Sequence, residues 1–209
     1  DLHRLIRRQR QMCIRDSLIG VTAVVIFPLR DSLLHSYGQT LPDTRTMAKR
    51  WVEANIKPGS RILMDMYVYS PQIRESIGQL KEKYAKAMRL NHREKEYIRY
   101  KIEAHQGGGY RVFTISRTFI ETGTVKHEVE EAKQMEDLVY MDKGFQSLKR
   151  NRIDYIILNS FNEKELENKE TPLARFYRRV KEECTLIKCF KPRKYKIQGP
   201  IIYIYKFGS

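Results

Sequence analysis

The chain has 209 residues, a length that suits one domain of ordinary size with a real hydrophobic core. Forty lysines and arginines against 25 aspartates and glutamates give a formal charge of +15 at pH 7. This excess favours a polyanionic partner, such as nucleic acid, an anionic membrane surface or a phosphate-bearing substrate, without choosing among them. Three cysteines are too few for a disulfide framework. We expect Cys184 and Cys189 to be buried thiols, and a pair formed in an oxidising compartment is the alternative.

The first 40 residues differ in character from the rest. The string Met12–Ser17 looks like translated sequencing-adapter sequence, so we interpret residues 1–16 as a sequencing or assembly scar and exclude them from the fold prediction. Leu18–Leu29 is apolar and uncharged but about a dozen residues long, whereas a membrane-spanning helix needs roughly 20. We interpret residues 17–40 as the remnant of a last transmembrane helix with a polar connector, and an ordinary core element is the alternative. Residues 41–209 are predicted to form the α/β domain.

A complete helix–strand unit is predicted over Leu41–Ile73. Asp43 is a suitable N-cap, because its carboxylate can accept hydrogen bonds from the free N–H groups of the first helical turn. Pro58 ends the helix, since proline cannot continue it. A strand begins at Ile62 and is expected to continue through Asp65 and Tyr67. The apolar spacing predicts a buried helix face that consists of Met47, Trp51, Val52 and Ile56.

Ile153–Asn159 is the clearest buried strand, an apolar run without the alternation of a half-exposed strand. The element order predicts an α/β, Rossmann-like fold: a mostly parallel sheet of about five strands covered by helices, with a C-terminal antiparallel β-hairpin and a short N-terminal apolar helix remnant. The other predicted elements are a helical region over Gln72–His105 that breaks at Asn91, a strand over Tyr110–Arg117, a helical region over His127–Asn151, a helix over Pro172–Cys184, and strands over Leu186–Phe190 and Ile201–Phe207.

The predicted helical region over Gln72–His105 is strongly basic. A solvated surface is the simplest interpretation of its charges, with contact to anionic lipid headgroups and binding to nucleic acid as alternatives. Near an anionic membrane each basic side chain could contribute about 1 kcal/mol. The basic residues are Lys81, Lys83, Lys86, Arg89, Arg93, Lys95, Arg99 and Lys101.

No catalytic constellation is identifiable from residue spacing. The sequence has no nucleophile elbow, P-loop, zinc-ligand cluster or recognisable Cys/His nucleophile pair. Gly107–Gly109 precedes a strand instead of linking a strand to a helix N-terminus, so we interpret it as a turn and not as a phosphate loop. We expect no catalytic residue, no metal and no cofactor in this chain.

Three stretches together resemble one known family. The first comprises Asp43–Arg45, Ala48, Trp51, Asn55–Ser60 and Tyr67–Pro71, the second is Ile153–Phe161, and the third comprises Lys188, Phe190, Pro192, Gly199, Pro200, Ile202, Ile204 and Tyr205. In order and spacing they are similar to the segment after the last membrane helix of polytopic glycosyltransferases of family 39, the protein O-mannosyltransferase-like group.

The resemblance implies that this chain is the extracytoplasmic C-terminal domain of a cell-membrane enzyme that takes its sugar from a polyprenyl-phosphate carrier. In that family the catalytic carboxylates lie in an early extracytoplasmic loop, so this fragment is not expected to be active alone. The implied partner is the membrane body of the same polypeptide, and anionic lipid or polyprenyl-phosphate headgroups are further possible contacts. Two other hypotheses remain: a stand-alone basic α/β module that binds nucleic acid or another polyanion, and a small α/β enzyme of unknown chemistry.

Candidate substrate-binding residues lie in the first helix and at the carboxyl ends of strands, where α/β sheets collect ligands. Arg45 could hold a carrier phosphate or a carboxylate through its planar donor fork, or form a structural salt bridge. Tyr67 and Tyr69 could stack on a sugar or serve as half-buried packing residues, and Asp65 could cap a neighbouring loop. The candidates are Arg45, Asp65, Tyr67, Tyr69, Ser70, Asn159 and Ser160.

Overall fold

The structure, a computed structural model, describes residues 21–22, 24–65, 69–116, 138–140, 144–161, 172–193 and 196–208. The chain divides into two compact units between Leu41 and Pro42. In the first unit, residues 24–40 form a helix that includes the stretch predicted as a connector, and large apolar side chains such as Phe27 and Leu33 are exposed along it. Among the described residues, no helix combines the length and the hydropathy needed to cross a membrane. The predicted scar at residues 1–16 lies outside the described residues.

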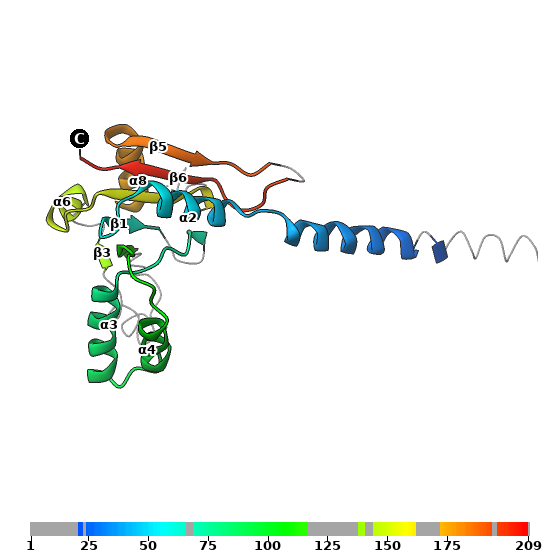
Figure 1. The fold of residues 1–209 in the computed structure, drawn as a ribbon. Coiled ribbons are helices and arrows are strands. Elements are labelled where there is room, and N and C mark those ends of the chain that lie inside the picture. The colour runs from blue at the N-terminus through cyan, green and yellow to red at the C-terminus, as the bar shows by residue number, and fades with distance from the viewer. Residues whose placement is uncertain are drawn as a thin grey trace, which may run out of the picture. The chain divides into compact units, whose positions relative to one another are not determined.

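The second unit is an α/β structure built on a six-stranded mixed sheet with the strand order β3-β2-β1-β4-β6-β5 (Figure 1). The strands β3, β2, β1 and β4 are parallel, whereas β6 is antiparallel to both β4 and β5. The strands are β1 (Arg61–Met64), β2 (Arg111–Ser116), β3 (Leu138–Tyr140), β4 (Tyr155–Asn159), β5 (Thr185–Phe190) and β6 (Ile202–Lys206). The helices are α2 (Thr44–Asn55), α3 (Ile77–Arg89), α4 (Lys95–Glu103), α6 (Gly144–Arg150) and α8 (Pro172–Glu183). The predicted α/β class and the C-terminal antiparallel hairpin are confirmed.

Strand β4 lies in the interior of the sheet, between β1 and β6, and both of its faces are buried. Ile157 joins a core cluster that includes Ala48 and Val52 of α2. Ile156 and Leu158, which alternate with Ile157, join the opposite cluster with residues of α6 and α8. Helices therefore cover the sheet on both faces, as the uninterrupted apolar run of this strand predicted.

Helix α2 covers its face through small side chains. Its buried stripe is Thr44, Ala48 and Val52, each with no exposed surface. Met47 and Trp51, which the sequence assigned to the buried face, are only half-buried at the border of this cluster. Val52 and Ile56 are buried as predicted, but Thr44 and Ala48 take the places expected for Met47 and Trp51.

Two strand predictions need correction. Strand β1 ends at Met64, so Asp65 follows the strand instead of continuing it, and Tyr67 lies outside the described residues. Leu138–Tyr140 forms the edge strand β3, parallel to the end of β2, although the sequence predicted a helical region over His127–Asn151. The helix-favouring glutamates, lysines and methionines around this three-residue strand conceal it from a periodicity analysis.

Helices α3 and α4 follow β1 and precede β2 in the chain. They form a helical hairpin that projects from the sheet (Figure 1). Asn91, where the sequence predicted a break, has a φ of 48° between the two helices. The hairpin has its own small cluster, in which Ala87 and Ile98 are buried and Tyr84 and Ile102 pack against them.

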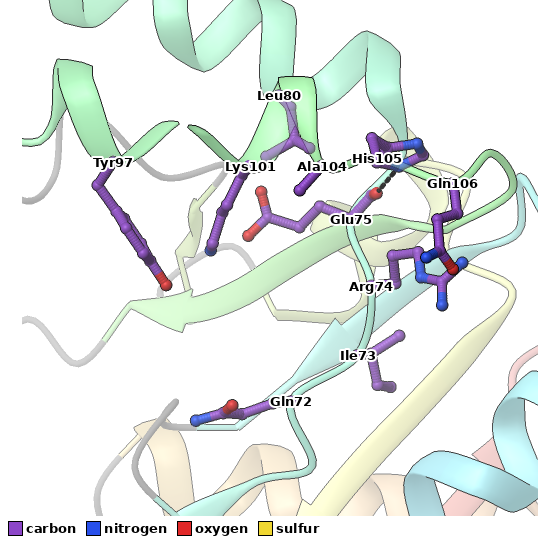
Figure 2. Close-up of a pocket in the computed structure, with 10 residues that line it drawn as sticks. All are labelled: Gln72, Ile73, Arg74, Glu75, Leu80, Tyr97, Lys101, Ala104, His105 and Gln106. Carbon is purple, nitrogen blue, oxygen red and sulfur yellow. Dashed lines mark hydrogen bonds between the residues drawn. The ribbon is translucent and has the colours of Figure 1, made fainter. Parts of the chain in front are cut away.

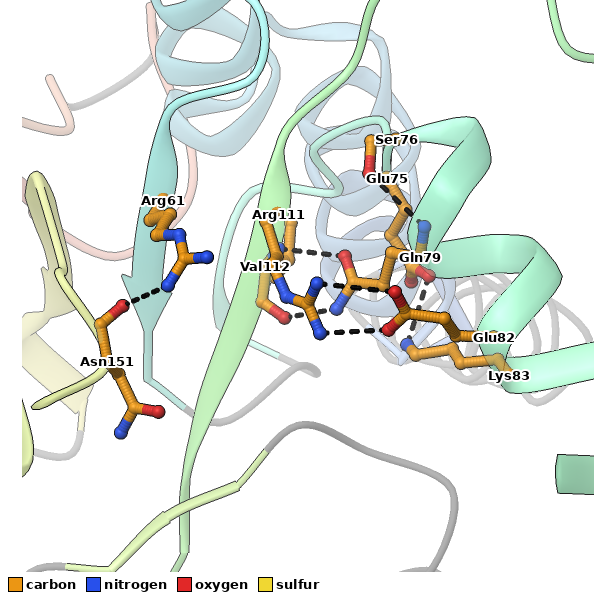
Figure 3. Close-up of polar contacts among 9 residues, drawn as sticks. All are labelled: Arg61, Glu75, Ser76, Gln79, Glu82, Lys83, Arg111, Val112 and Asn151. Atoms are coloured by element: carbon orange, nitrogen blue, oxygen red, sulfur yellow. Dashed lines mark hydrogen bonds and ion pairs between the residues drawn. The ribbon is translucent and has the colours of Figure 1, made fainter.

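The carboxamide of Gln79 fastens this hairpin to the sheet (Figure 3). Val112 of β2 turns its backbone polar groups toward α3, and β3 begins to pair with β2 only at Thr114. Gln79 Nε2 donates to the carbonyl oxygen of Val112 at 2.6 Å, and Val112 N–H donates to Gln79 Oε1 at 2.9 Å. The side chain thus replaces a missing strand partner for one residue.

We predict that Gln79→Ala destabilises the protein by about 2 to 6 kcal/mol, because it leaves a buried N–H and a buried carbonyl unpaired at about 1 to 3 kcal/mol each. Urea denaturation followed by circular dichroism measures the change. Gln146→Ala, at an exposed position of α6, is the matched control and should change stability by less than about 0.5 kcal/mol. Equal effects of the two variants would contradict this role of Gln79.

Candidate functional site

A pocket of about 500 Å³ lies where the chain leaves the carboxyl ends of β1 and β4. Three of the predicted substrate-binding residues, Arg45, Tyr69 and Ser160, line it together. The other lining residues are Phe161, Pro192, Gly199, Pro200 and Ile201. Residues from α2, from the segments that follow β1 and β4, and from the loop between β5 and β6 therefore meet at one opening.

Aromatic rings form one wall of this pocket. The rings of Tyr69 and Phe161 stack with their centroids 4.1 Å apart and an interplanar angle of 19°. Phe161 is 47% exposed, and Tyr69 is half-buried. Phe161 was not among the predicted site residues. Its position directly after Ser160, at the end of the buried strand, was the signal that could have identified it. A flat aromatic surface beside polar groups suits the apolar face of a sugar ring.

The guanidinium of Arg45 is held by Asp43. Arg45 Nε lies 2.9 Å from Asp43 Oδ1, and Nη2 lies 2.6 Å from Oδ2. Asp43 Oδ1 also accepts from the backbone N–H of Arg45 at 2.7 Å, which is the predicted N-cap interaction. The structural salt bridge, the alternative role of Arg45, is therefore present, and a phosphate at Arg45 would compete with this carboxylate.

The same contacts set the protonation of both groups. Burial raises the pKa of Asp43, but the hydrogen bonds from the side chain and the backbone N–H of Arg45, together with its charge, outweigh burial and leave this pKa below its ordinary value of 3.8. The hydrogen bond to Asp43 raises the pKa of Arg45 against the opposing effect of burial. The pair is ionised throughout the physiological pH range.

A buried polar network lies behind the pocket. Asn159 Nδ2 is 3.2 Å from Asp65 Oδ2 and 3.4 Å from Ser70 Oγ, and the Tyr177 hydroxyl donates to the Asp65 carboxylate. The structure thus brings together three predicted site residues, Asp65, Ser70 and Asn159, but their side chains are buried. In this arrangement they join the ends of β1 and β4 to α8 and do not face a ligand. Tyr177 was missed, since nothing distinguishes it from the other apolar residues of its helix.

The loop before β6 closes the pocket by docking on the first turn of α2. Thr44 N–H donates to the carbonyl of Gln198 at 2.9 Å, and Thr44 Oγ1 donates to the carbonyl of Pro200 at 2.7 Å. Ser160 Oγ accepts from the backbone N–H of Ile201 at 3.0 Å. Gly199 has a φ of 101°, and a Cβ at this position would overlap Thr44 Oγ1 and press on Asp43. A side chain at residue 199 would therefore have to displace the side chains of Thr44 and Asp43.

A second pocket, of about 380 Å³, lies between the segment before α3 and the C-terminal end of α4 (Figure 2). His105 accepts from the N–H of Gly107 through Nδ1 at 3.0 Å, so its Nε2 carries the proton donated to the Glu75 carbonyl at 2.9 Å. The Glu75 carboxylate, 3.0 Å from Lys83 Nζ, forms an ion pair, although Oε2 is not aligned for a hydrogen bond. None of the predicted site residues lines this pocket.

The described residues contain no group of three or more His, Cys, Asp or Glu side chains arranged to hold a metal ion. Cys184 and Cys189 are half-buried and form no disulfide, and burial together with the charge of Glu183 raises the pKa of Cys184 to about 11. No family model, curated protein or solved structure matches this chain.

We predict that Gly199→Ala destabilises the protein more than Gly59→Ala does. Both glycines have positive φ, which costs an alanine roughly 1 to 2 kcal/mol. Only Gly199 is packed against other atoms, so its substitution adds about 1 to 3 kcal/mol of overpacking. Denaturant unfolding measures both variants, and equal losses would show that the loop is not held as tightly as these contacts require.

We predict that Asp43→Asn removes an acid-sensitive part of the stability. Because the pKa of Asp43 is depressed in the folded state, its contribution is complete above the unfolded value near 3.8 and is lost as the pH falls through the folded value. Asparagine still caps the helix but cannot form the ion pair, and the expected loss at pH 7 is roughly 0.5 to 1 kcal/mol. Urea unfolding at pH 7 and at pH 2.5 should show this difference only at pH 7.

Proposed function

We propose that residues 42–208 form the extracytoplasmic C-terminal domain of a polytopic membrane glycosyltransferase that uses a polyprenyl-phosphate-linked sugar. In this proposal the pocket at the carboxyl ends of β1 and β4 contacts the sugar-phosphate headgroup, and the reacting carboxylates belong to the membrane body. The domain positions the donor and does not carry out the transfer itself.

One observation carries the proposal. The three stretches that resemble family 39 glycosyltransferases are separated by more than 80 and by about 25 residues in the sequence, yet all of them reach the same pocket. Arg45 and Tyr69 come from the first stretch, Ser160 and Phe161 from the second, and the loop that includes Gly199 from the third. All three stretches thus contribute residues to one opening, and this shared location supports the proposal.

The strand order also supports this choice of site. We propose that the sheet is a Rossmann-like variant, in which the parallel order β3-β2-β1-β4 places a change of winding direction between β1 and β4. In open α/β sheets, ligands bind outside the carboxyl ends of strands at such a point. The C-terminal hairpin then replaces further parallel strands and supplies one wall of the pocket.

The chemistry of the lining suits a sugar attached to a phosphate. The stacked rings of Tyr69 and Phe161 offer an apolar surface to a hexose or pentose ring. Arg45 lines the same pocket, and its guanidinium, which is paired with Asp43, can exchange that carboxylate for a phosphate. The volume lies within the range of small-molecule sites.

A binding measurement tests the pocket. The purified chain is titrated with a short-chain polyprenyl-phosphate hexose, and binding is followed by calorimetry. Phe161→Ala should weaken binding roughly tenfold, because it removes a stacking surface worth about 1 to 1.5 kcal/mol. Leu186→Ala, which replaces a side chain of similar exposure on β5, is the matched control. Equal affinities of these two variants, or no binding by the unsubstituted chain, would reject the pocket as a donor site.

The identity of the parent enzyme has its own test. The reading frame that encodes residues 17–209 should continue upstream into several apolar spans, with an acidic pair in an early extracytoplasmic loop. A start codon without such spans would exclude a polytopic glycosyltransferase, whatever the pocket binds.

A further inference from the structure

The helical hairpin of α3 and α4 exposes an unusual share of the apolar surface. In the described part of residues 42–208, seven large apolar side chains are exposed, and five of them belong to this hairpin. Scattered single exposed residues are normal on a protein surface, but their concentration on one projecting element is not. The five are Ile77, Met88, Leu90, Tyr97 and Tyr100, and the remaining two are Phe161 and Leu186.

Basic side chains surround the end of this hairpin. We define the hairpin tip as residues 88–95, the last residues of α3, the connection and the first residue of α4. Within it Met88 is 53% exposed and Leu90 is 46% exposed. Arg89 and Arg93 are also exposed, and neither has an ion-pair partner among the described residues. The tip therefore presents two apolar side chains beside two arginines that have no ion-pair partner among the described residues.

The interior of the hairpin does not require these exposed groups. Its small cluster uses Ala87 and Ile98 with Tyr84 and Ile102, and Gln79 fixes its base to β2. The opposite end points away from the sheet (Figure 1). The hairpin is thus anchored at one end and free to present its tip to a partner.

We propose that the tip of the α3–α4 hairpin docks on an anionic phospholipid surface, with Met88 and Leu90 entering the boundary of the acyl chains and Arg89 and Arg93 binding lipid phosphates. An anionic membrane interacts favourably with both kinds of side chain. Each inserted apolar side chain strengthens binding by roughly tenfold, and each basic residue strengthens it by about fivefold. A nucleic acid would reward only the charges, because exposed Met and Leu find no apolar environment on a phosphate backbone. The apolar component therefore favours lipid. This inference goes beyond the sugar pocket and does not depend on it.

A reporter placed at the tip tests the proposal in the full chain. Trp51 is the only tryptophan, so Trp51→Phe combined with Leu90→Trp gives a single fluorophore at the tip. With vesicles of phosphatidylcholine and phosphatidylglycerol, its emission should shift to the blue and be quenched by nitroxide-labelled lipid. A reporter at Leu186→Trp in the same Trp51→Phe background should show neither change. Absence of quenching at the tip while the chain sediments with the vesicles, for instance through residues 24–40, would overturn the proposal.

Measurements of vesicle partitioning separate the contribution of the apolar side chains from that of the arginines. Met88→Ser with Leu90→Ser should weaken binding to anionic vesicles by roughly 100-fold, whereas Leu186→Ser should leave it unchanged. Arg89→Gln with Arg93→Gln should weaken it by roughly 25-fold on anionic vesicles and have little effect on phosphatidylcholine alone. Lys57→Gln with Lys206→Gln is the matched charge control at exposed positions.

Two further outcomes keep the proposals distinct. If the tip arginines are needed for binding to a generic DNA duplex and not to anionic vesicles, the partner is a nucleic acid and the lipid proposal is wrong. Phe161→Ala should leave vesicle binding unchanged. The docking of the tip can therefore be correct even if the pocket binds no sugar, and the pocket can bind a sugar even if the tip does not dock.

Discussion

The burial of strands β1 and β4 on both faces is the constraint on which the rest of this structure depends. Ile62 and Ile157 pack under α2, whereas Leu63 and Ile156 pack under α6 and α8. Two adjacent strands without a solvent-facing side must be covered by helices on both sides, and the chain can turn only beyond their ends. The opening at the carboxyl ends of these strands follows from that arrangement, because every covering helix must begin or end near it.

The same constraint explains why polar residues at these strand ends are connected to one another. A carboxylate or carboxamide that leaves a covered strand is still buried, and an unpaired polar group at that depth costs about 1 to 3 kcal/mol. Asp65 and Asn159 therefore share a hydrogen bond, and Tyr177 reaches the same carboxylate from α8. This network holds the back of the pocket in place, while residues a few positions further along, such as Phe161, reach its surface.

The sequence was sufficient to predict most elements around the pocket, but not which of the predicted site residues face it. Cap residues and apolar runs are local signals, so α2, β1, β2, β4 and the last hairpin could be predicted directly. The three-residue strand β3 could not, because only its pairing with β2 distinguishes it from its helix-favouring surroundings. Likewise, spacing does not show which strand-end residues face a ligand, because the burial of Asp65 and the stacking of Phe161 on Tyr69 arise from tertiary contacts.

The α3–α4 hairpin is not part of the double-faced core around β1 and β4. Its exposed residues are therefore not determined by the packing of that core. Among the described residues of the connection between β1 and β2, only Ile73 and Tyr110, near its two ends, join either main cluster. Gln79 supplies the pairing that the open part of β2 needs, and a cluster of four side chains holds the two helices together. Neither requirement explains exposed Met88 and Leu90 between basic residues. Since folding does not demand such a surface, and solubility argues against it, the composition of the tip is the physical argument for proposing a partner with both an apolar and an anionic component.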